Sequence, residues 1–395
     1  MRFPGFEGEW ETKKLSAYLY ENKERNRNGE FNKSDVLSVS GDCGIVNQIE
    51  LLGRSFAGKS VADYHVVRTD DIVYTKSPLK EYPYGIVKYN NGKDGIVSTL
   101  YAVYHHKDNV DGQFVEYYFT NPQRTNRYFK PIVRIGAKHD MKIGNEEVLE
   151  NFVIFPCLKE QKKITEMLSL LDQRIAIQNK VIEDLKRLKR AINNQFHDSV
   201  TCGIKTCFAD LGNSYSGLSG KAASDFGEGY PFIPYTNVFS NTVIDENDYG
   251  LVNVSKDEHQ NIVEHGDLII TLSSETPEEV GVGAVYMGHD KEIYLNSFCF
   301  GIHFHALDRV MPKYLAYMVE SNMFRRFVYP LAQGSTRYNL QKGDFEKKLF
   351  TLPTLAEQSQ IVAVLDTISS KLDLEKSILK NLTTVKASMI QGLFV

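Results

Sequence analysis

The chain repeats itself, and this repeat constrains the fold more than any other feature of the sequence. Residues 155–196 and 352–393 match without a gap at an offset of 197 positions, which carries Pro156 to Pro353 and Gln161 to Gln358. Both copies begin with the pattern P-x-L-x-E-Q-x-x-I. The preceding segments repeat more loosely, as "DDIVYTKS" and "GDLIITLS" show. One half of the chain is therefore a diverged copy of the other, and we expect two similar units related by a pseudo-two-fold repeat.

Each copy contains a long helix with the hydrophobic seam of a coiled coil. Apolar residues alternate at spacings of three and four over some thirty residues, or about 45 Å, which exceeds the face of one domain. Matching polar residues interrupt both seams: Gln178 and Glu375, then Lys189 and Lys386. We predict that the helices form an antiparallel coiled coil whose polar positions fix its register; the alternative is that each helix covers only its own domain. The predicted seam residues are Leu168, Leu171, Ile175, Ile182, Leu185, Ile192 and Phe196, and Leu365, Ile368, Leu372, Leu379, Leu382, Met389 and Leu393.

The segments before each helix read as mixed domains. Short alternating stretches such as "GIVSTLYAVYHH" and "GDLIITLS" predict strands, whereas "GQFVEYYFTNPQRTNRYF" and "PKYLAYMVESNMFRRFVY" predict helices that end near a proline. The expected fold class is α+β: two similar domains separated by two long helices. We predict one domain over residues 1–155, a central helix over 156–200, a second domain over 201–352 and a C-terminal helix over 353–395. An antiparallel pair of helices would hold the two domains apart like jaws.

Composition narrows the class of protein. Hydrophobic residues make up 42% and charged residues 24% of the 395 residues, which is typical of a soluble globular protein. No apolar run reaches the roughly 18 residues of a membrane helix, and the N-terminus does not resemble a signal peptide, so we expect a cytoplasmic protein without membrane contact. The five cysteines are scattered, with no C-x-x-C pair, and favour neither a zinc site nor a disulfide framework.

The stretch "GRSFAGKS", Gly53 to Ser60, matches the phosphate-loop pattern G-x-x-x-x-G-K-[ST]. A stand-alone NTPase using this loop is therefore one alternative. The functional loop requires a preceding strand and a following helix of several turns, yet only a short segment separates Ser60 from the next expected strand. The other half of the chain has no counterpart of the pattern. We interpret the stretch as a basic surface loop.

Other catalytic patterns are also incomplete. "TNPQR" at Thr120 lacks the second proline and the aromatic residue of the adenine-methyltransferase motif. "GVGAVYMG" lacks the glycine spacing of a dinucleotide loop. His303 and His305 share one face of an expected strand, but no cysteine or carboxylate pattern accompanies them. We expect no catalytic, cofactor-binding or metal-ligating residues in this chain.

Charge is segregated along the sequence despite a net charge of −4. Residues 121–142 contain six Lys or Arg and one Asp, whereas residues 242–292 contain twelve Asp or Glu and two Lys. The counterpart of the basic segment in the second half contains Arg325, Arg326, Arg337 and Lys342, so both halves place positive charge at equivalent positions. Arginine suits phosphates and guanine edges, and hydroxyl and amide groups suit base edges and backbone, so we predict DNA binding. The predicted DNA-binding residues are Arg124, Arg127, Lys138, Lys142, Arg325, Arg326, Ser335, Thr336, Arg337 and Asn339.

Three sequence features are similar to those of a known family: the N-terminal "FPGFEGEWETKKL", the loop "AQGSTRYNL", and the twice-used P-x-L-x-E-Q followed by a long helix. The chain resembles specificity subunits of type I restriction–modification systems over essentially its whole length. The first half departs from the pattern, because "RIGAKHD" stands where the second half has "AQGSTRY". A coiled-coil scaffold without a role on DNA is the remaining alternative.

The resemblance implies a function and a set of partners. Each domain would be a target-recognition domain that reads one half of a bipartite site on double-stranded DNA, and the helices would set the gap between the half-sites. The subunit itself would be non-catalytic. It would dock two methyltransferase subunits, which use S-adenosylmethionine, and two motor-nuclease restriction subunits, which use ATP and magnesium. No cofactor is expected in this chain.

Overall fold

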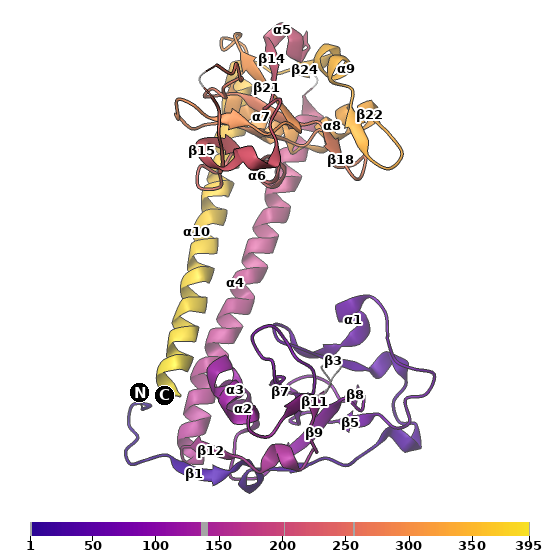
Figure 1. Cartoon of the computed structure of the whole chain (residues 1–395), viewed down its shortest axis with the longest axis vertical. Helices are drawn as coiled ribbons and strands as arrows, with labels where there is room; N and C mark the ends of the chain where they lie inside the picture. Colours follow the sequence, from indigo (N-terminus) through magenta and orange to yellow (C-terminus); the bar gives the residue numbers. More distant parts are fainter. Residues whose placement is uncertain (1, 136–140, 201, 256, 395) are drawn as a thin grey trace. The chain divides into compact units, whose positions relative to one another are not determined.

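The computed structural model describes residues 2–135, 141–200, 202–255 and 257–394 (Figure 1). The chain forms two compact units, unit 1 with Met1–Gln178 and Ile378–Val395, and unit 2 with Asn179–Ser377. Each unit combines an α+β domain with parts of the two long helices, α4 (Leu158–Ser199) and α10 (Leu355–Leu393). The predicted fold class is confirmed, whereas the exact division into four segments stays a prediction.

Unit 1 is centred on a four-stranded antiparallel sheet with the strand order β2-β9-β6-β7. These strands are β2 (Leu19–Glu21), β9 (Tyr101–His106), β6 (Ile72–Thr75) and β7 (Val87–Tyr89). Four two-stranded ribbons flank the sheet: β1 (Glu11–Lys14) with β12 (Phe152–Phe155), β3 (Leu37–Ser40) with β4 (Gly44–Asn47), β5 (His65–Val67) with β8 (Gly95–Val97), and β10 (Arg134–Ile135) with β11 (Met141–Lys142). The helices of the domain are α1 (Gln48–Leu52), α2 (Gly112–Phe119) and α3 (Pro122–Phe129).

Unit 2 repeats this plan with the strand order β14-β21-β17-β19, again fully antiparallel. These strands are β14 (Gly212–Ser216), β21 (Cys299–Phe304), β17 (Leu268–Thr271) and β19 (Gly283–Val285). Three smaller sheets join β15 (Phe226–Ile233) with β16 (Gly250–Val252) and β20 (Tyr294–Leu295), β23 (Tyr338–Leu340) with β18 (Ser273–Ser274) and β22 (Ala332–Gln333), and β13 (Ile204–Thr206) with β24 (Phe350–Leu352). The helices are α5 (Phe208–Leu211), α6 (Tyr235–Ser240), α7 (Pro312–Val319), α8 (Asn322–Val328) and α9 (Lys342–Lys347). The matching order of the central strands confirms the internal repeat.

Local sequence signals explain where the paired domain helices begin. The side chain of Asp111 accepts a hydrogen bond from the amide of Phe114 and so caps α2. Asn121 caps α3 in the same way, and Pro122 occupies its first turn, where an amide hydrogen would have no partner. Ser321 caps α8. The second helix of each pair, α3 or α8, therefore begins at a polar capping residue in both halves, whereas α7 begins at Met311 without a side-chain cap.

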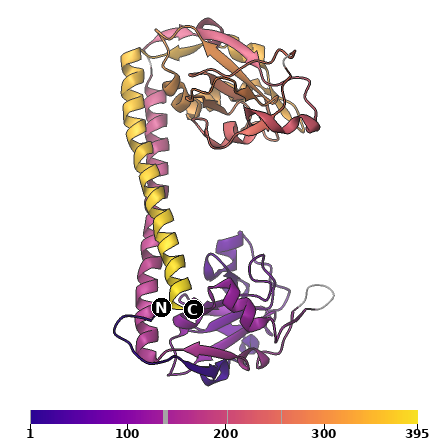
Figure 2. The same cartoon turned by 60° about the vertical axis from the view of Figure 1, so that its left-hand side comes forward.

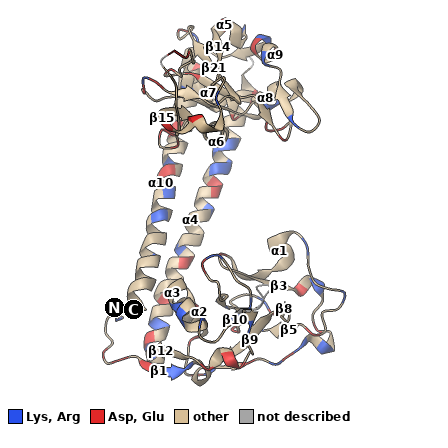
Figure 3. Ribbon diagram, viewed as in Figure 1, with Lys and Arg blue, Asp and Glu red and all other residues tan. Residues whose placement is uncertain are grey.

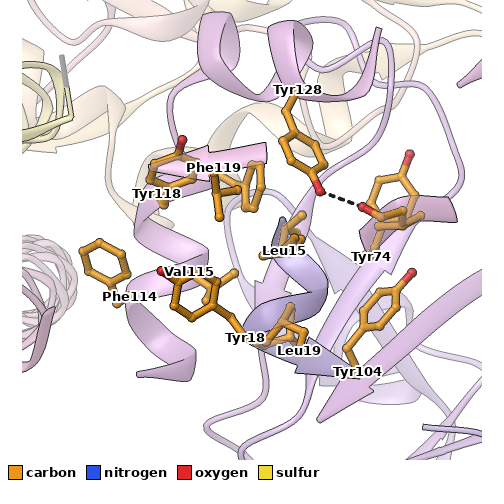
Figure 4. Packing of buried hydrophobic residues seen from close by; sticks show 14 of the residues in the cluster. Leu15, Tyr18, Leu19, Tyr74, Tyr104, Phe114, Val115, Tyr118, Phe119 and Tyr128 are labelled. Atoms are coloured by element: carbon orange, nitrogen blue, oxygen red, sulfur yellow. Dashed lines mark hydrogen bonds between the residues drawn. The ribbon is translucent and has the colours of Figure 1, made fainter. Parts of the chain in front are cut away.

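The core of unit 1 lies between its sheet and the α2–α3 pair (Figure 4). Tyr74 stacks on Phe129 with ring centroids 4.4 Å apart, and Tyr128 donates a hydrogen bond of 2.7 Å to the carbonyl of Val148. The opposite face of the sheet packs against the β3–β4 and β5–β8 ribbons through a second, smaller cluster that includes Val73 and Val103. Both faces of the central sheet are therefore buried.

Both long helices enter the core of each unit. In unit 1 the beginning of α4 contributes Ile164 and Leu168, and the end of α10 contributes Ile390, Leu393 and Phe394. In unit 2 the beginning of α10 contributes Ile361 and Leu365, while Ile192 and Phe196 from the end of α4 pack against the same cluster. The beginning of one helix thus lies beside the end of the other, as Figures 1 and 2 also show within each unit. The predicted antiparallel helix pair is confirmed.

The predicted seam residues are buried or partly buried, with one exception. Met389 is 37% exposed, whereas its neighbour Ile390 is 6% exposed. The end of α10 turns Ile390, Leu393 and Phe394 towards the core of unit 1. The spacing of these three residues is that of an ordinary helix face, which replaces the coiled-coil spacing where α10 meets the domain. Of the other predicted seam residues, Leu168, Ile182, Leu365, Leu372 and Leu393 are buried, and Leu171, Ile175, Leu185, Ile192, Phe196, Ile368, Leu379 and Leu382 are partly buried.

The polar seam positions are also turned inward. Gln178 is 3% exposed and Glu375 is 8% exposed, so both polar side chains are buried as the seam pattern predicts. Lys189 and Lys386 are partly buried. Exposed charges of both signs are distributed along the remaining surfaces of α4 and α10 (Figure 3). The two helices therefore meet through an apolar seam that contains specific polar positions.

Candidate nucleic-acid interface

The second domain carries a short hairpin formed by β22 and β23, with the loop Gly334–Arg337 at its tip. Gly334 has a φ of +144°, and a Cβ atom there would lie 2.0 Å from the carbonyl oxygen of Arg337. Only glycine fits this turn. On its other side β23 pairs with β18 through Asn339 and Tyr338, so the base of the hairpin is held in a three-stranded sheet. The loop therefore extends from a three-stranded sheet.

The side chains of this hairpin form a polar, exposed surface. The structure brings together four of the predicted DNA-binding residues here, and Ser335, Thr336, Arg337 and Asn339 are all exposed. The guanidinium of Arg337 lies 5.2 Å from the ring centroid of Phe298, which is itself 49% exposed. This cation–π contact orients the guanidinium while leaving its hydrogen-bond donors available. Among the described residues no carboxylate pairs with Arg337.

Phe298 is a residue of this surface that the sequence analysis missed. It lies in the loop before β21, about 40 positions from Arg337 along the chain, and its amide donates a hydrogen bond of 2.9 Å to the side chain of Asn296. An aromatic residue flanked by polar residues in an expected strand region gives no separate signal in one sequence. We use the name hairpin surface for the exposed residues Ser335, Thr336, Arg337 and Asn339 together with Phe298.

The two arginines of α8 have structural partners. Arg325 donates hydrogen bonds of 2.7–2.9 Å to the carbonyl groups of Glu278, Val280 and Gly281. Burial lowers the pKa of Arg325 below its usual value. We therefore assign Arg325 to holding the 278–281 loop and leave it out of the interface. Arg326 is exposed and pairs with the carboxylate of Asp198 near the end of α4.

The equivalent residues of the first domain are spread over three places. Arg124 is half-buried, and its guanidinium lies over the rings of Tyr118, at 4.6 Å, and Phe394, at 5.3 Å. Arg124 thus packs the end of α10 against the domain, and burial lowers its pKa. Arg127 is exposed on α3, and Lys142 is exposed on β11. Lys138 lies outside the described residues.

The strands on either side of residues 136–140 nevertheless correspond to the strands of the β22–β23 hairpin in the second domain. β10 and β11 pair in antiparallel fashion, with Arg134 opposite Lys142. This hairpin follows α3 as the β22–β23 hairpin follows α8. Two antiparallel strand pairs with different residues therefore occupy the same position of the repeat.

The repeated E-Q of the helix motif has a structural role. Gln161 is fully buried. Its side-chain amide donates a hydrogen bond of 2.9 Å to the carbonyl of Pro156, and its side-chain oxygen accepts a hydrogen bond of 3.0 Å from the amide of Asp111. Gln358 repeats these contacts, donating 2.8 Å to the carbonyls of Pro353 and Arg309 and accepting 2.8 Å from the amide of Met311. Each glutamine therefore clamps the start of a long helix to the loop before α2 or α7.

The preceding glutamate behaves differently in the two copies. Glu160 is buried and pairs with Arg2 at 3.0 Å. Glu357 is exposed and accepts hydrogen bonds from the amide and hydroxyl of Thr354. The glutamine is therefore the part of the motif whose contacts both copies share.

The geometry of Gly53–Ser60 does not suit a phosphate loop. The five-residue helix α1 comes before the stretch and ends at Gly53, which has a left-handed conformation with φ 74°. No helix follows Ser60 before β5 begins at His65. Without a helix N-terminus after the lysine, no row of free amides faces a phosphate. Lys59 is exposed, and Arg54 lies 4.6 Å over the ring of Phe56.

The histidine of β21 has a carboxylate partner that the sequence pattern does not reveal. His303 lies 2.8 Å from Asp267, and His105 of the first domain contacts Asp71 in the same way. Both carboxylates are buried and accept an amide hydrogen bond of 2.8 Å from the residue three positions earlier. Each histidine–aspartate contact links two neighbouring strands of a central sheet, β6 with β9 in unit 1 and β17 with β21 in unit 2.

Within the described part of the chain, no three potential ligands lie close enough together to form a metal site. No helix of this part is long and apolar enough to cross a membrane.

Fold and site together define a duplicated two-domain protein, in which each α+β domain carries a short hairpin and the two copies share an antiparallel helix pair. Residues 210–384 match the family described as "Type I restriction modification DNA specificity domain". This segment therefore belongs to that family, and the predicted resemblance to type I specificity subunits is confirmed.

Two curated proteins that match parts of this chain are named as type I specificity subunits. The chain is 26% identical over 122 residues to the type I restriction enzyme StySPI specificity subunit of Salmonella potsdam, a match covering 30% of this chain and 25% of that protein. It is 29% identical over 146 residues to the putative type I restriction enzyme MjaX specificity subunit of Methanocaldococcus jannaschii, covering 34% and 33%. The matches span only a quarter to a third of the length of these relatives.

Solved structures share the fold over the full chain. A chain from a structure on complex assembly and conformational transition of the type I R-M system has a TM-score of 0.60 at 14% identity, with 98% of this chain and 97% of that chain covered. The type I restriction–modification S subunit from M. genitalium has a TM-score of 0.55 at 13% identity, with 98% and 96% covered. These likenesses establish the fold.

Proposed function

We propose that this protein is the DNA-specificity subunit of a type I restriction–modification complex, and that each of its two domains reads one half of a bipartite DNA site. The observation that carries the proposal is the location of the hairpin surface inside the segment that belongs to the DNA specificity family. The structural repeat extends the proposal to the first domain, because the same sheet order and the same hairpin recur there.

The hairpin surface has the chemistry of base recognition. An arginine fork donates two parallel hydrogen bonds to a guanine edge, and its stack on Phe298 limits the rotamers that must be frozen on binding. The neighbouring hydroxyl and amide groups of Ser335, Thr336 and Asn339 suit phosphate and base edges. Arg127 and Lys142 are the exposed basic residues that we propose for the first domain.

Recognition and catalysis would take place on different subunits. We propose that the chain is non-catalytic, and that methylation with S-adenosylmethionine and ATP-driven restriction with magnesium take place on methyltransferase and motor-nuclease subunits, two of each, docked to it. The complex would act in the cytoplasm. One of the structural neighbours comes from a study of type I R-M complex assembly, which supports the assignment of partners of this kind.

The test is genome-wide mapping of methylated adenine in cells with and without the gene. We expect a bipartite, asymmetric methylated site that is absent when the gene is deleted. Exchanging residues 201–352 for those of a related subunit should change one half of the site and preserve the other half. A change in both halves, or in neither, would contradict the division of reading between the two domains.

A point variant tests the hairpin surface itself. Arg337→Lys keeps the charge but removes the planar fork, so we expect one position of one half-site to lose about 1–3 kcal/mol of base discrimination. The matched control is Arg309→Ala, which removes an exposed arginine outside the hairpin surface and should leave the site unchanged. Unaltered discrimination in Arg337→Lys would remove Arg337 from base recognition.

A further inference from the structure

One seam lysine of each long helix contacts a domain helix. In unit 1, Lys386 of α10 forms an ion pair with Asp172 of α4 and lies 5.6 Å from the ring centroid of Tyr117 on α2. The hydroxyl of Tyr117 donates a hydrogen bond of 2.7 Å to the same carboxylate. Burial and the bond to Asp172 both raise the pKa of Tyr117, so its hydroxyl keeps the proton that it donates. Three elements meet in this cluster: α2, α4 and α10.

Unit 2 contains the equivalent cluster with the long helices exchanged. Lys189, now from α4, lies 5.1 Å from the ring centroid of Tyr317 on α7 and 3.4 Å from Glu320 at the end of α7. Tyr317 donates a hydrogen bond of 2.6 Å to Asp366 of α10, and Lys313 pairs with that carboxylate at 2.7 Å. Again a domain helix and both long helices are joined.

The two clusters are related by the repeat, but they are not copies residue by residue. Lys189 and Lys386 are equivalent at the offset of 197 positions, whereas Asp172 corresponds to Ser369 and Asp366 corresponds to Ser169. The aspartate and the serine thus exchange places within one helical turn. Tyr317 still contacts Ser369 at 3.3 Å. The same three-way connection is made by different residues, which indicates that the connection matters more than any one pair.

Stability of the helix pair does not explain the lysines. A polar residue at a seam position lowers the stability of a coiled coil, and an apolar side chain there would pack better. Lys386 instead directs its ammonium to the ring of Tyr117 on α2 and to Asp172 of α4. Lys189 directs its ammonium to the ring of Tyr317 on α7 and to Glu320 at the end of α7. In both clusters the tyrosine of the domain helix donates a hydrogen bond to a carboxylate of a long helix and places its ring beside the lysine ammonium. These partly buried, charge-assisted contacts break when the domain helix rotates or slides along the long helices. Each cluster therefore resists tilting of the domain on its own part of the helix pair.

We propose that the Tyr117–Asp172–Lys386 and Tyr317–Asp366–Lys189 clusters are positioning latches that fix the angle between each recognition domain and the helix pair, and thereby restrict the gap between half-sites that the complex accepts. This inference rests on the proposed function. A domain held at one angle meets its half-site at one distance along the DNA. A domain free to tilt tolerates half-sites that are one base pair too near or too far.

The test measures methylation by the full complex on DNA that carries the two half-sites with the natural gap or with a gap one base pair shorter or longer. For Lys386→Met, and separately for Lys189→Met, we expect the ratio of the kcat/KM on the natural gap to that on the altered gaps to fall by about tenfold, the size expected for one charge-assisted hydrogen bond. Lys386→Arg keeps the charge and should restore most of the discrimination. Tyr117→Phe should lower it in the same direction as Lys386→Met.

Lys380→Met is the matched control, because Lys380 lies on the same helix and is exposed; it should leave the gap preference unchanged. The latch is overturned if Lys386→Met slows methylation equally on all gaps, or lowers the melting temperature without altering the ratio. Failure of the proposed function is distinguishable, because the unaltered complex would then show no preference for any bipartite site.

Discussion

At the scale of single residues, the sequence identified the conspicuous positions but not what most of them do. Gln161 and Gln358 stand out because the repeat preserves them, yet their partners are backbone groups of loops about 50 residues away along the chain, and no spacing rule links these segments. Arg325 and Arg124 illustrate the opposite problem. A basic residue in a basic segment resembles a DNA contact until tertiary packing shows that its guanidinium is held by carbonyl groups or aromatic rings.

The glutamine clamp gives the first prediction. Gln358→Leu leaves the partly buried amide of Met311 without its acceptor and removes two further hydrogen bonds. We expect a loss of about 2–3 kcal/mol in the free energy of unfolding, and chemical denaturation of the full chain measures it. Ser359→Ala, at the exposed next position, should change the free energy by less than about 0.5 kcal/mol. Equal effects of the two variants would refute the clamp.

The second residue-scale prediction concerns pH. His65 is buried, and this burial, with the positive charges of Arg25 and Lys76, lowers its pKa from 6.5 to about 4. Between these values the unfolded chain binds a proton that the folded chain does not. The stabilisation by neutral His65 is thus complete above about pH 6.5 and is lost as the pH falls towards 4.

We expect His65→Gln to flatten the decline in stability between pH 6.5 and 4 by roughly 2–3 kcal/mol relative to the unaltered chain, a value given by the size of the pKa shift. Urea denaturation at several pH values measures the difference. The same substitution at the exposed His259 provides the control. If the two variants had parallel pH profiles, the burial of His65 would not govern this part of the curve.

At the scale of elements, the hydrophobic periodicity predicted both long helices. It did not predict the change of packing where the end of α10 meets the domain of unit 1. The coiled-coil spacing located both long helices, because a seam of some thirty residues is longer than the face of a single domain and needs a second long helix to bury it. It failed at Met389, where α10 leaves the seam to pack on a domain that the spacing rule does not include. The hairpin of the first domain was hard to place for a related reason: its backbone pairing, not its residue types, is what the two copies share.

This junction gives the third prediction. Ile390→Ala removes a side chain that is 6% exposed in the core of unit 1, and we expect a loss of about 2–4 kcal/mol. Met389→Ala, one position earlier and 37% exposed, should cost less than about 1 kcal/mol. Thermal unfolding of the two variants compares them directly. The reverse order would restore Met389 to the seam and contradict the turn of α10 into the domain.

At the scale of the whole molecule, the internal repeat is the main support for the proposed function. A single polar hairpin on an α+β domain would suggest only nucleic-acid binding, whereas two such domains on a shared helix pair suggest two half-sites and a spacer. If the helix pair determines that spacer, its length must be convertible into base pairs. One heptad adds about 10 Å of helix, which equals about three base pairs at 3.4 Å each.

The insertion must be made in both helices at the same level. Asp172 pairs with Lys386, so Ile175 and Leu382, each about one turn from that pair towards the middle of its helix, are matched seam positions. A heptad after Ile175 together with one after Leu382 preserves the seam, and we expect the methylated site to acquire a gap about three base pairs longer with both half-sites unchanged. A heptad after Ile175 alone leaves seven residues without a counterpart and should lower the melting temperature instead. Methyladenine mapping of the double insertion is decisive, since an unchanged gap in a stably folded variant would mean that the helices do not measure the distance between half-sites.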